Sequence, residues 1–263
     1  QRSYSNMLVR LADYNRYLES MASKLSHELR TPITVVKSSL ENINRDESNT
    51  VFMERAKDGV DRLNDILTRM SEATRLENSL QAEEKQKINI AKIVSGCSEG
   101  YQIAHGADKF RLQLQANSLN GDIYIKGCAE LIAQLLDKLV SNALDFSDKS
   151  TPVTISLIEK PSHITLSVAN SGSQLPEYMQ SNLFESMVSV REKPSEQAHL
   201  GLGLYIVRLI ADFHSAKPFA RNFFPNENLK PLNGEITQDL LRSQILDDQG
   251  VVVGVDFPNY SDG

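Results

Sequence analysis

The 263-residue sequence contains only two cysteines, Cys97 and Cys128, and neither belongs to a CxxC pair. Two isolated cysteines exclude a disulfide framework and a cysteine-pair zinc site, and they fit a reducing compartment. The sequence also lacks a basic excess, because 28 Lys+Arg stand against 34 Asp+Glu and the formal net charge is -6. A nucleic-acid-binding face needs excess basic charge, so we expect no nucleic-acid partner.

No apolar run reaches the roughly 20 residues that a membrane-spanning helix needs. The chain starts at Gln1 without Met and without a signal-peptide pattern, so we expect a fragment of a longer protein. Its composition, with 40% hydrophobic and 24% charged residues, is that of an ordinary globular chain. The length exceeds that of one typical domain, at about 100–200 residues per domain, but does not require three domains.

The first part of the chain has the periodicity of a coiled coil. Residues recur at alternating steps of three and four: Leu8, Leu11, Asn15, Leu18, Ala22, Leu25 and Leu29. Asn15 falls at an a position, where a buried Asn favours a parallel dimer in one register. The alternative interpretation is a single amphipathic helix packed on its own domain.

A second periodic stretch runs from Met53 to Thr74, and the polar segment 42–50 predicts a turn between two antiparallel helices. Two helices with one apolar stripe each cannot bury both stripes alone, so we predict a homodimeric four-helix bundle. The polar run 81–87 predicts a linker or a frayed helix end.

Beyond this linker the pattern is that of an α+β domain with a mostly antiparallel sheet. Helices are predicted over 90–104, 129–146 and 202–213, and strands over 111–116, 153–157, 164–168 and 251–257.

The string from Ser26 to Pro32, Ser-His-Glu-Leu-Arg-Thr-Pro, lies within the first predicted helix. Counting from Ala22 at a places His27 at f, facing away from the seam. A neutral imidazole is a good nucleophile, and the adjacent Glu28 could hold one ring nitrogen protonated or take up its proton.

This string resembles the H-box of bacterial sensor histidine kinases. The resemblance implies that His27 accepts the γ-phosphoryl group of ATP and passes it to an aspartate of a response regulator receiver domain. It assigns Glu28 as the acid/base partner, and Thr31 as the residue that orients water when the regulator is dephosphorylated. The stretch around 21–42 also resembles sensor kinases found beside sortase genes in marine proteobacteria.

The resemblance further implies a two-layer α/β sandwich ATPase domain, of the type in gyrase and the heat-shock chaperones, that uses ATP and Mg²⁺. Residues 139–147 resemble the N-box, 168–176 the first glycine box, 183–185 the F-box and 200–204 the second glycine box. Asn142 would be the Mg²⁺ ligand. The implied nucleotide-binding residues are Lys138, Asn142, Asp145, Phe146, Asn170, Gly172, Gln174, Leu175, Arg191, Leu200, Gly201, Leu202, Gly203 and Leu204.

Several of these positions depart from the family pattern. Asn170 replaces the adenine-binding aspartate and Gln174 a glycine, while Lys138 and Asp145 replace an asparagine and a lysine. An amide oxygen accepts a hydrogen bond more weakly than a carboxylate does. Two hypotheses follow. Either these substitutions lie in a pocket that still binds ATP, or the chain is a degenerate kinase that acts as a regulator phosphatase or a regulatory binding module.

The resulting domain prediction has four parts. Residues 1–20 end an input helix, 21–82 form the dimerisation and phosphotransfer hairpin, 83–87 the linker, and 88–263 the ATP-binding domain with an insertion at 218–248. By resemblance, the chain is the cytoplasmic portion of a bacterial inner-membrane sensor, attached to the membrane only through segments upstream.

Overall fold

The computed structural model describes residues 22–23, 25–43, 49–148, 151–176, 179, 182–185, 201–223 and 249–260. The chain divides into two compact units: Gln1–Arg75 with Ser186–Leu202, and Leu76–Glu185 with Gly203–Gly263. Residues 1–20, for which the end of an input helix is predicted, lie outside the described residues. None of the described helices is long and apolar enough to cross a bilayer.

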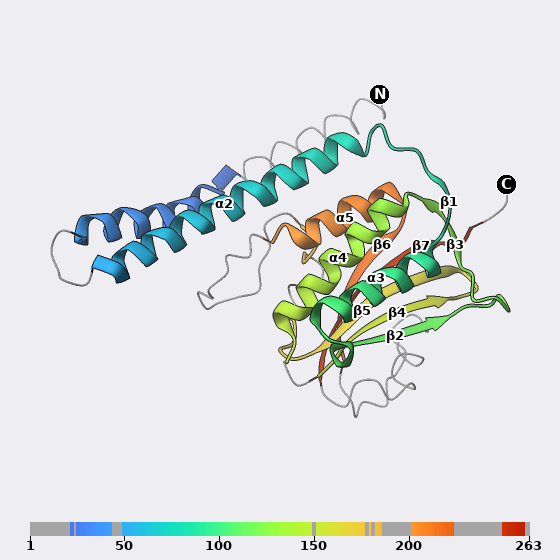
Figure 1. The fold of residues 1–263 in the computed structure, drawn as a ribbon. Coiled ribbons are helices and arrows are strands. Elements are labelled where there is room, and N and C mark those ends of the chain that lie inside the picture. The colour runs from blue at the N-terminus through green and yellow to red at the C-terminus, as the bar shows by residue number, and fades with distance from the viewer. Residues whose placement is uncertain are drawn as a thin grey trace, which may run out of the picture. The chain divides into compact units, whose positions relative to one another are not determined.

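The first unit contains the predicted helical hairpin. Residues 25–42 are helical, and α2 (Asn49–Ser79) runs back beside them (Figure 1). Gly59 of α2 allows this approach, because a Cβ there would lie 2.6 Å from Val36 Cγ2 and 3.2 Å from the carbonyl oxygen of Pro32. The missing side chain thus brings the two helices together.

The apolar stripe predicted for the second helix is not a core within one chain. Met53, Val60 and Leu67 are 62%, 45% and 55% exposed, whereas Ile66 and Ala73 are buried. The face of α2 that contains Ile66 and Ala73 is therefore buried, whereas the predicted stripe is partly exposed, with Leu63 and Met70 half-buried.

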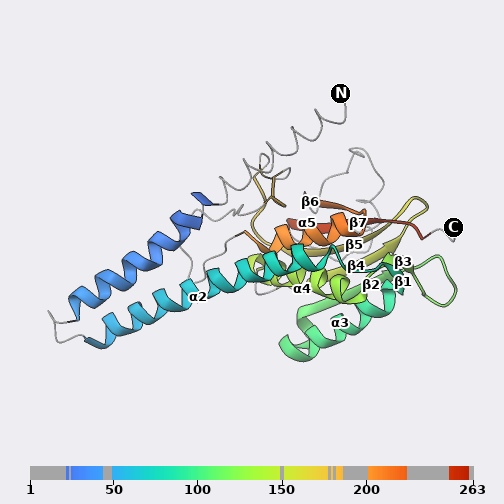
Figure 2. The ribbon, with the colours of Figure 1, turned by 90° about the horizontal axis from the view of Figure 1, so that it is seen from above.

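The second unit is a two-layer α/β sandwich. Its elements are β1 (Gln86–Asn89), α3 (Ile90–His105), η1 (Ala107–Lys109), β2 (Phe110–Gln115), β3 (Tyr124–Gly127), α4 (Ala129–Phe146), β4 (Val153–Glu159), β5 (His163–Ser171), α5 (Gly203–Phe213), β6 (Lys217–Phe223) and β7 (Gly250–Pro258). Helices α3, α4 and α5 cover one face of the main sheet (Figures 1 and 2). This confirms the predicted α+β class and sandwich.

The main sheet has the strand order β2-β4-β5-β7-β6, and β1 pairs with β3 in a separate antiparallel ribbon. Within the main sheet β2 is parallel to β4 and the other pairs are antiparallel, as expected. Alternate residues of β4, β5 and β7, such as Ile155, Leu166 and Val255, are fully buried, as are Leu135 and Leu136 of α4. The core therefore lies between the helices and the sheet.

Two strands overlap the predicted domain boundaries. Strand β1 begins at Gln86, within the residues predicted as the linker 83–87. Strand β6 occupies Lys217–Phe223 and pairs with β7 along its whole length, so the first residues of the predicted insertion 218–248 are part of the main sheet. Residues 224–248 lie outside the described residues.

Strand β6 is held by two aromatic rings that lie over glycines of its neighbour. A Cβ on Gly250 would come within 2.6 Å of the Phe223 ring, and one on Gly254 within 2.7 Å of the Phe219 ring. Phe223 is 2% exposed. Glycines in β7 therefore give these rings a place to pack, which stabilises an edge strand that contains a proline.

Helix α5 ends in a turn built around a buried histidine. The backbone N–H groups of Ser215 and Ala216 donate to the carbonyl oxygens of Asp212 and Ala211, and Ser215 has a φ of 56°. This is the Schellman arrangement, in which glycine is usual at the position of Ser215.

The imidazole of His214 is 2% exposed and both of its nitrogens are engaged. Nε2 accepts from the Cys128 N–H at 3.2 Å, so Nδ1 carries the proton and donates to the Ile210 carbonyl oxygen at 2.7 Å. Burial lowers the pKa of His214, and the nearby Lys85 acts in the same direction. The ring thus joins the end of α5 to the start of α4 as a neutral group.

Replacing His214 with leucine should lower the free energy of unfolding by about 1–3 kcal/mol above pH ~6.5, because the Cys128 N–H loses its acceptor. The folded-state pKa lies below the ordinary value, so the unfolded chain takes up this proton first, and wild-type stability falls as the pH drops below ~6.5. Urea unfolding of wild type and His214→Leu should therefore show that the difference between their free energies of unfolding becomes smaller as the pH falls below ~6.5.

His27→Leu is the matched control, because His27 is exposed and should give an unchanged difference from wild type. A gap between wild type and His214→Leu that stays constant on acidification would contradict the neutral, buried role of His214.

Candidate active site

His27 lies on the exposed surface of the first helix. Ser26, His27 and Glu28 are all exposed, whereas Leu25 and Leu29 on either side are partly buried. The imidazole of His27 makes no hydrogen bond with any described residue. A histidine presented in this way has a ring nitrogen that is accessible to an incoming electrophile.

The two residues predicted to assist His27, Glu28 and Thr31, lie differently with respect to its side chain. Glu28 is exposed and makes no hydrogen bond to His27, because side chains at i and i+1 of a helix diverge. Thr31 lies on the His27 side, one turn on, and its hydroxyl has no partner among the described residues. By contrast, the Thr34 hydroxyl donates to the Arg30 carbonyl oxygen at 2.8 Å. Thr31 is therefore free to bind water.

The predicted N-box residues and the adjacent Lys138 lie on the last two and a half turns of α4. Lys138, Asn142, Asp145 and Phe146 are all half-buried. Leu139, Val140 and Ala143 of the same helix are buried against the core, which fixes the orientation of the polar residues between them.

The end of α4 is joined to the first glycine box. Ser147 and Gly172 form an isolated antiparallel bridge, and the Asp148 N–H donates to the Ser171 carbonyl oxygen at 2.9 Å. Gly172 has a φ of 144°, and a Cβ there would lie 2.5 Å from the carbonyl oxygen of Phe146. Only glycine fits this junction, which brings the N-box and the first glycine box together.

The two substituted residues of the first glycine box sit in different environments. Asn170 is 3% exposed, and its amide nitrogen donates to the Ser171 carbonyl oxygen at 3.4 Å. Gln174 is half-buried, and its amide nitrogen is buried without a hydrogen-bond partner among the described residues. Such an orphan donor is costly unless a ligand or water accepts from it.

One residue that shapes this loop, Asn222, was not among the predicted site residues. The Asn222 side chain of β6 accepts from the Leu175 N–H and donates to the Leu175 carbonyl oxygen, both at 2.8 Å. The backbone of Leu175 is thereby fixed, and Leu175 can contribute to a nucleotide site only through its side chain. Asn222 lies within the predicted insertion 218–248, and no motif in the sequence indicates its contact with Leu175.

The second glycine box precedes α5, as predicted. Gly201 has a φ of 66°, Leu202 is 1% exposed, and Gly203 opens the helix with the buried Leu204 behind it. Unpaired backbone N–H groups at a helix start are suited to phosphate oxygens. Arg191 and Leu200 lie outside the described residues.

The described residues contain no cluster of three or more His, Cys, Asp or Glu side chains that could hold a metal ion by themselves. The amide of Asn142 makes no hydrogen bond with a described residue, so its oxygen can accept a cation. Mg²⁺ takes oxygen ligands and is usually bound through one or two protein groups together with phosphates and water, which fits a single amide here.

Two family models match this chain. Residues 17–79 match the His Kinase A (phospho-acceptor) domain, and residues 127–237 match the histidine kinase-, DNA gyrase B-, and HSP90-like ATPase domain. The first match contains His27, and the second contains Asn142, Gly172 and Gly203.

The curated relatives of this chain are sensor proteins, in agreement with the two family models. The chain is 27% identical to the sensor protein CreC of Escherichia coli over 84% of its length and 46% of that protein. It is also 27% identical to the sensor-like histidine kinase SenX3 of Mycolicibacterium smegmatis, over 73% of the chain and 51% of that protein. The chain thus spans about half the length of the curated relatives it matches.

Solved structures share the fold. The histidine kinase ThkA in complex with the response regulator protein TrrA matches with a TM-score of 0.65 and 18% identity, over 95% of this chain and 64% of that one. The Acinetobacter baumannii histidine kinase AdeS matches with a TM-score of 0.54 and 17% identity, over 89% of this chain and 98% of that one. With both family models matched in order, this chain belongs to the bacterial two-component sensor histidine kinases.

Proposed function

We propose that this chain is the kinase core of a sensor protein that phosphorylates His27 from ATP and Mg²⁺ and passes the phosphoryl group to an aspartate of a response regulator. The observation that carries this proposal is the exposed imidazole of His27 within the phospho-acceptor match. A regulator partner is supported by the relative ThkA, whose structure is that of a complex with the response regulator protein TrrA.

The residues would act as follows. The unprotonated ring nitrogen of His27 forms a bond to the γ-phosphorus while the bond from that phosphorus to the bridging oxygen breaks, which releases ADP. Glu28, whose exposed side chain would turn toward the ring in the reacting complex, would take up the proton that the other ring nitrogen then loses. Asn142 would hold Mg²⁺, which offsets the charge on the phosphates. Gly203 leaves room for phosphate oxygens near the backbone N–H groups at the start of α5, and Gly172 holds the first glycine box against the end of α4.

The hairpin needs a second copy to bury its apolar surface. Ile33 and Leu40 are seven residues apart on the first helix, and Met53, Val60 and Leu67 are seven apart on α2, and all five are exposed in the single chain. Apolar residues at heptad spacing pack against another helix of the same kind. This supports a homodimer formed as a four-helix bundle.

Three finer points stay predictions: attachment to a membrane through upstream segments, the domain boundaries, and the resemblance to sensor kinases beside sortase genes.

Incubation of the chain with γ-labelled ATP and Mg²⁺ should label the wild type and leave His27→Ala unlabelled, because no other group would carry the phosphoryl bond. His105→Ala, which removes another exposed histidine, should be labelled like the wild type. Wild type that is no more labelled than His27→Ala would reject kinase activity.

Thr31→Ala should keep His27 labelling and lose the dephosphorylation of a phosphorylated receiver domain, because the hydroxyl that orients water is gone. The receiver to use is the one that accepts phosphate most rapidly from labelled chain. Thr34→Ala is the control, because the Thr34 hydroxyl is already bonded to its own helix. Equal loss of labelling and dephosphorylation in Thr31→Ala would indicate a damaged helix instead.

The second candidate is a degenerate kinase that acts as a regulator phosphatase or regulatory binding module. It is favoured by Asn170 and Gln174, which replace residues that the family uses to hold the nucleotide.

Asn170→Asp should tighten ATP binding about tenfold, since a carboxylate forms a stronger hydrogen bond than an amide to the adenine amino group, by about 1 kcal/mol or more. Titration calorimetry with ATP and Mg²⁺ measures this. Asn120→Asp adds the same charge at an exposed position whose side chain makes no hydrogen bond with a described residue, and it should leave ATP binding unchanged. No ATP binding by wild type or Asn170→Asp would favour the degenerate kinase.

A further inference from the structure

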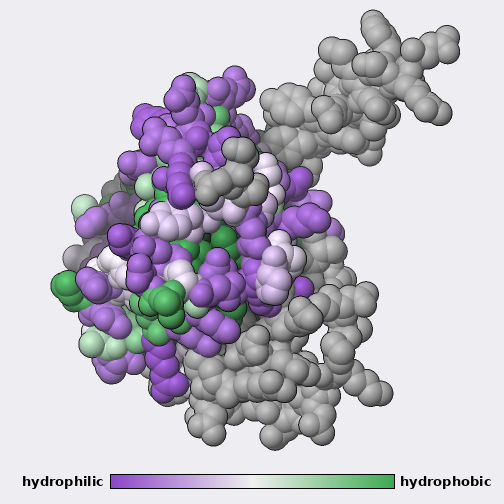
Figure 3. Space-filling view, turned by 90° about the vertical axis from the view of Figure 1, so that its right-hand side faces the viewer, coloured by the Kyte–Doolittle hydropathy of each residue, from purple (hydrophilic) through white to green (hydrophobic). Residues whose placement is uncertain are grey.

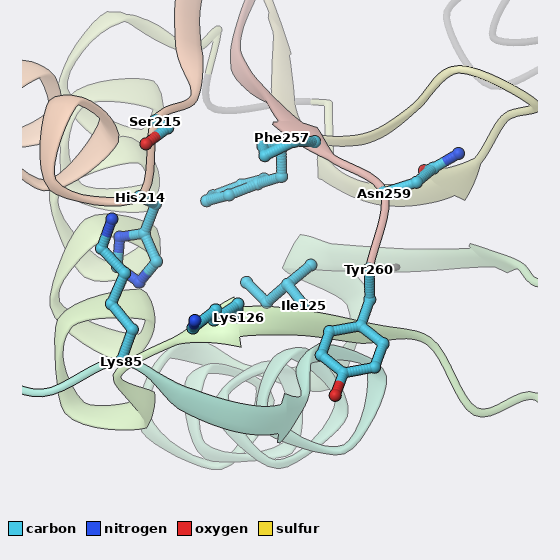
Figure 4. A pocket seen from close by; sticks show the side chains of 9 residues that line it. Lys85, Ile125, Lys126, His214, Ser215, Phe257, Asn259 and Tyr260 are labelled. Atoms are coloured by element: carbon cyan, nitrogen blue, oxygen red, sulfur yellow. The ribbon is translucent and has the colours of Figure 1, made fainter. Parts of the chain in front are cut away.

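A pocket of about 260 Å³ lies at the end of the second unit where α4 begins. Its walls come from four places: Lys85 just before β1, Ile125 and Lys126 of β3, His214 after α5, and the end of β7 at Phe257 with Tyr260 just beyond it (Figure 4). Figure 3 views this side of the molecule and shows an apolar area recessed within a mostly hydrophilic face.

This pocket is distinct from the candidate active site. Asn142 and Gly172 lie at the far end of α4, and 18 helical residues span about 27 Å. None of the lining residues belongs to the motifs of the predicted nucleotide site.

The charge in the pocket is positive. Lys85 and Lys126 both line it, and no carboxylate does. Lys126 makes no ion pair or hydrogen bond with any described residue. The contact found for Lys85 is with an aromatic ring, since its ammonium lies 5.1 Å from the centre of the Phe213 ring. Two ammonium groups without an acidic neighbour in the lining attract an anion.

The lining of the pocket includes apolar groups. Ile125 and Phe257 are each 1% exposed and form the buried layer beneath the pocket, toward which Figure 4 shows both side chains directed. Pro258 is exposed and Tyr260 is half-buried, and both line the pocket. His214 adds no ligand, because both of its ring nitrogens are used within the protein. Its ring instead packs edge-to-face on Phe257, with the ring centres 5.8 Å apart.

We propose that this pocket binds a small organic anion. Its carboxylate or other acidic group would lie near the ammonium groups of Lys85 and Lys126, and its apolar body would pack against Pro258 and the ring of Tyr260, above the buried Ile125 and Phe257. A volume of about 260 Å³ lies just below the range for drug-sized ligands, about 300–1,000 Å³, so a single-ring compound fits.

Benzoate is the probe, with benzyl alcohol as the neutral compound of the same shape and acetate as the anion without a ring. In the full chain, carrying labelled isoleucine methyl groups, millimolar benzoate should shift the Ile125 methyl signal. Benzyl alcohol and acetate should each bind about tenfold more weakly, because each lacks one of the two interactions.

Lys126→Ala should weaken benzoate binding about tenfold and Lys126→Arg should retain it, since the charge at the rim is what counts. Lys109→Ala is the control, because Lys109 is an exposed lysine in η1 and does not line the pocket. The proposal is overturned if benzoate leaves the Ile125 signal unchanged, if benzyl alcohol binds equally well, or if Lys126→Ala and Lys109→Ala behave alike. Benzoate binding is measured without ATP-dependent labelling of His27, so failure of the pocket proposal can be distinguished from failure of the kinase proposal.

Discussion

Helix α4 is held at both ends, and the two sites of the ATPase unit depend on this. At its start the Cys128 N–H donates to the buried His214, and at its end Ser147 bridges to Gly172. Between these anchors the helix packs against the sheet through fully buried leucines. These contacts fix the position of α4 along its axis, so Asn142 stays beside the first glycine box. The pocket lined by Lys85 and Lys126 lies at the opposite end of the helix.

The two units differ in how they bury apolar surface. The sandwich buries its core within one chain, whereas the hairpin leaves Met53, Val60 and Leu67 largely exposed. Burying one large apolar side chain fully is worth about 1.5–3 kcal/mol, so several at heptad spacing can stabilise association. The hairpin that carries His27 therefore gains stability from a second copy, and the ATPase unit does not need one.

The sequence was informative where an element is long and its apolar pattern strong. The predicted helix 129–146 coincides with α4, and both strands of the predicted hairpin around 153–168 are present. Strands β1 and β3 were missed because four residues are too few to establish an alternation. β6 was missed because Pro218 argues against a strand, and only its place at the sheet edge makes that proline tolerable.

The candidate site was predictable where a motif is local and unpredictable where a contact is long-range. Ser26 to Pro32 could be identified from adjacent residues, but the link from Asn222 to Leu175 joins residues 47 positions apart. The altered nucleotide residues show a further limit. The backbone of Asn170 pairs with Val251 across β5 and β7 whatever its side chain is. The scaffold therefore tolerates either aspartate or asparagine there, and fold similarity alone does not distinguish a strong ATP site from a weak one. The chemistry of the side chain decides it.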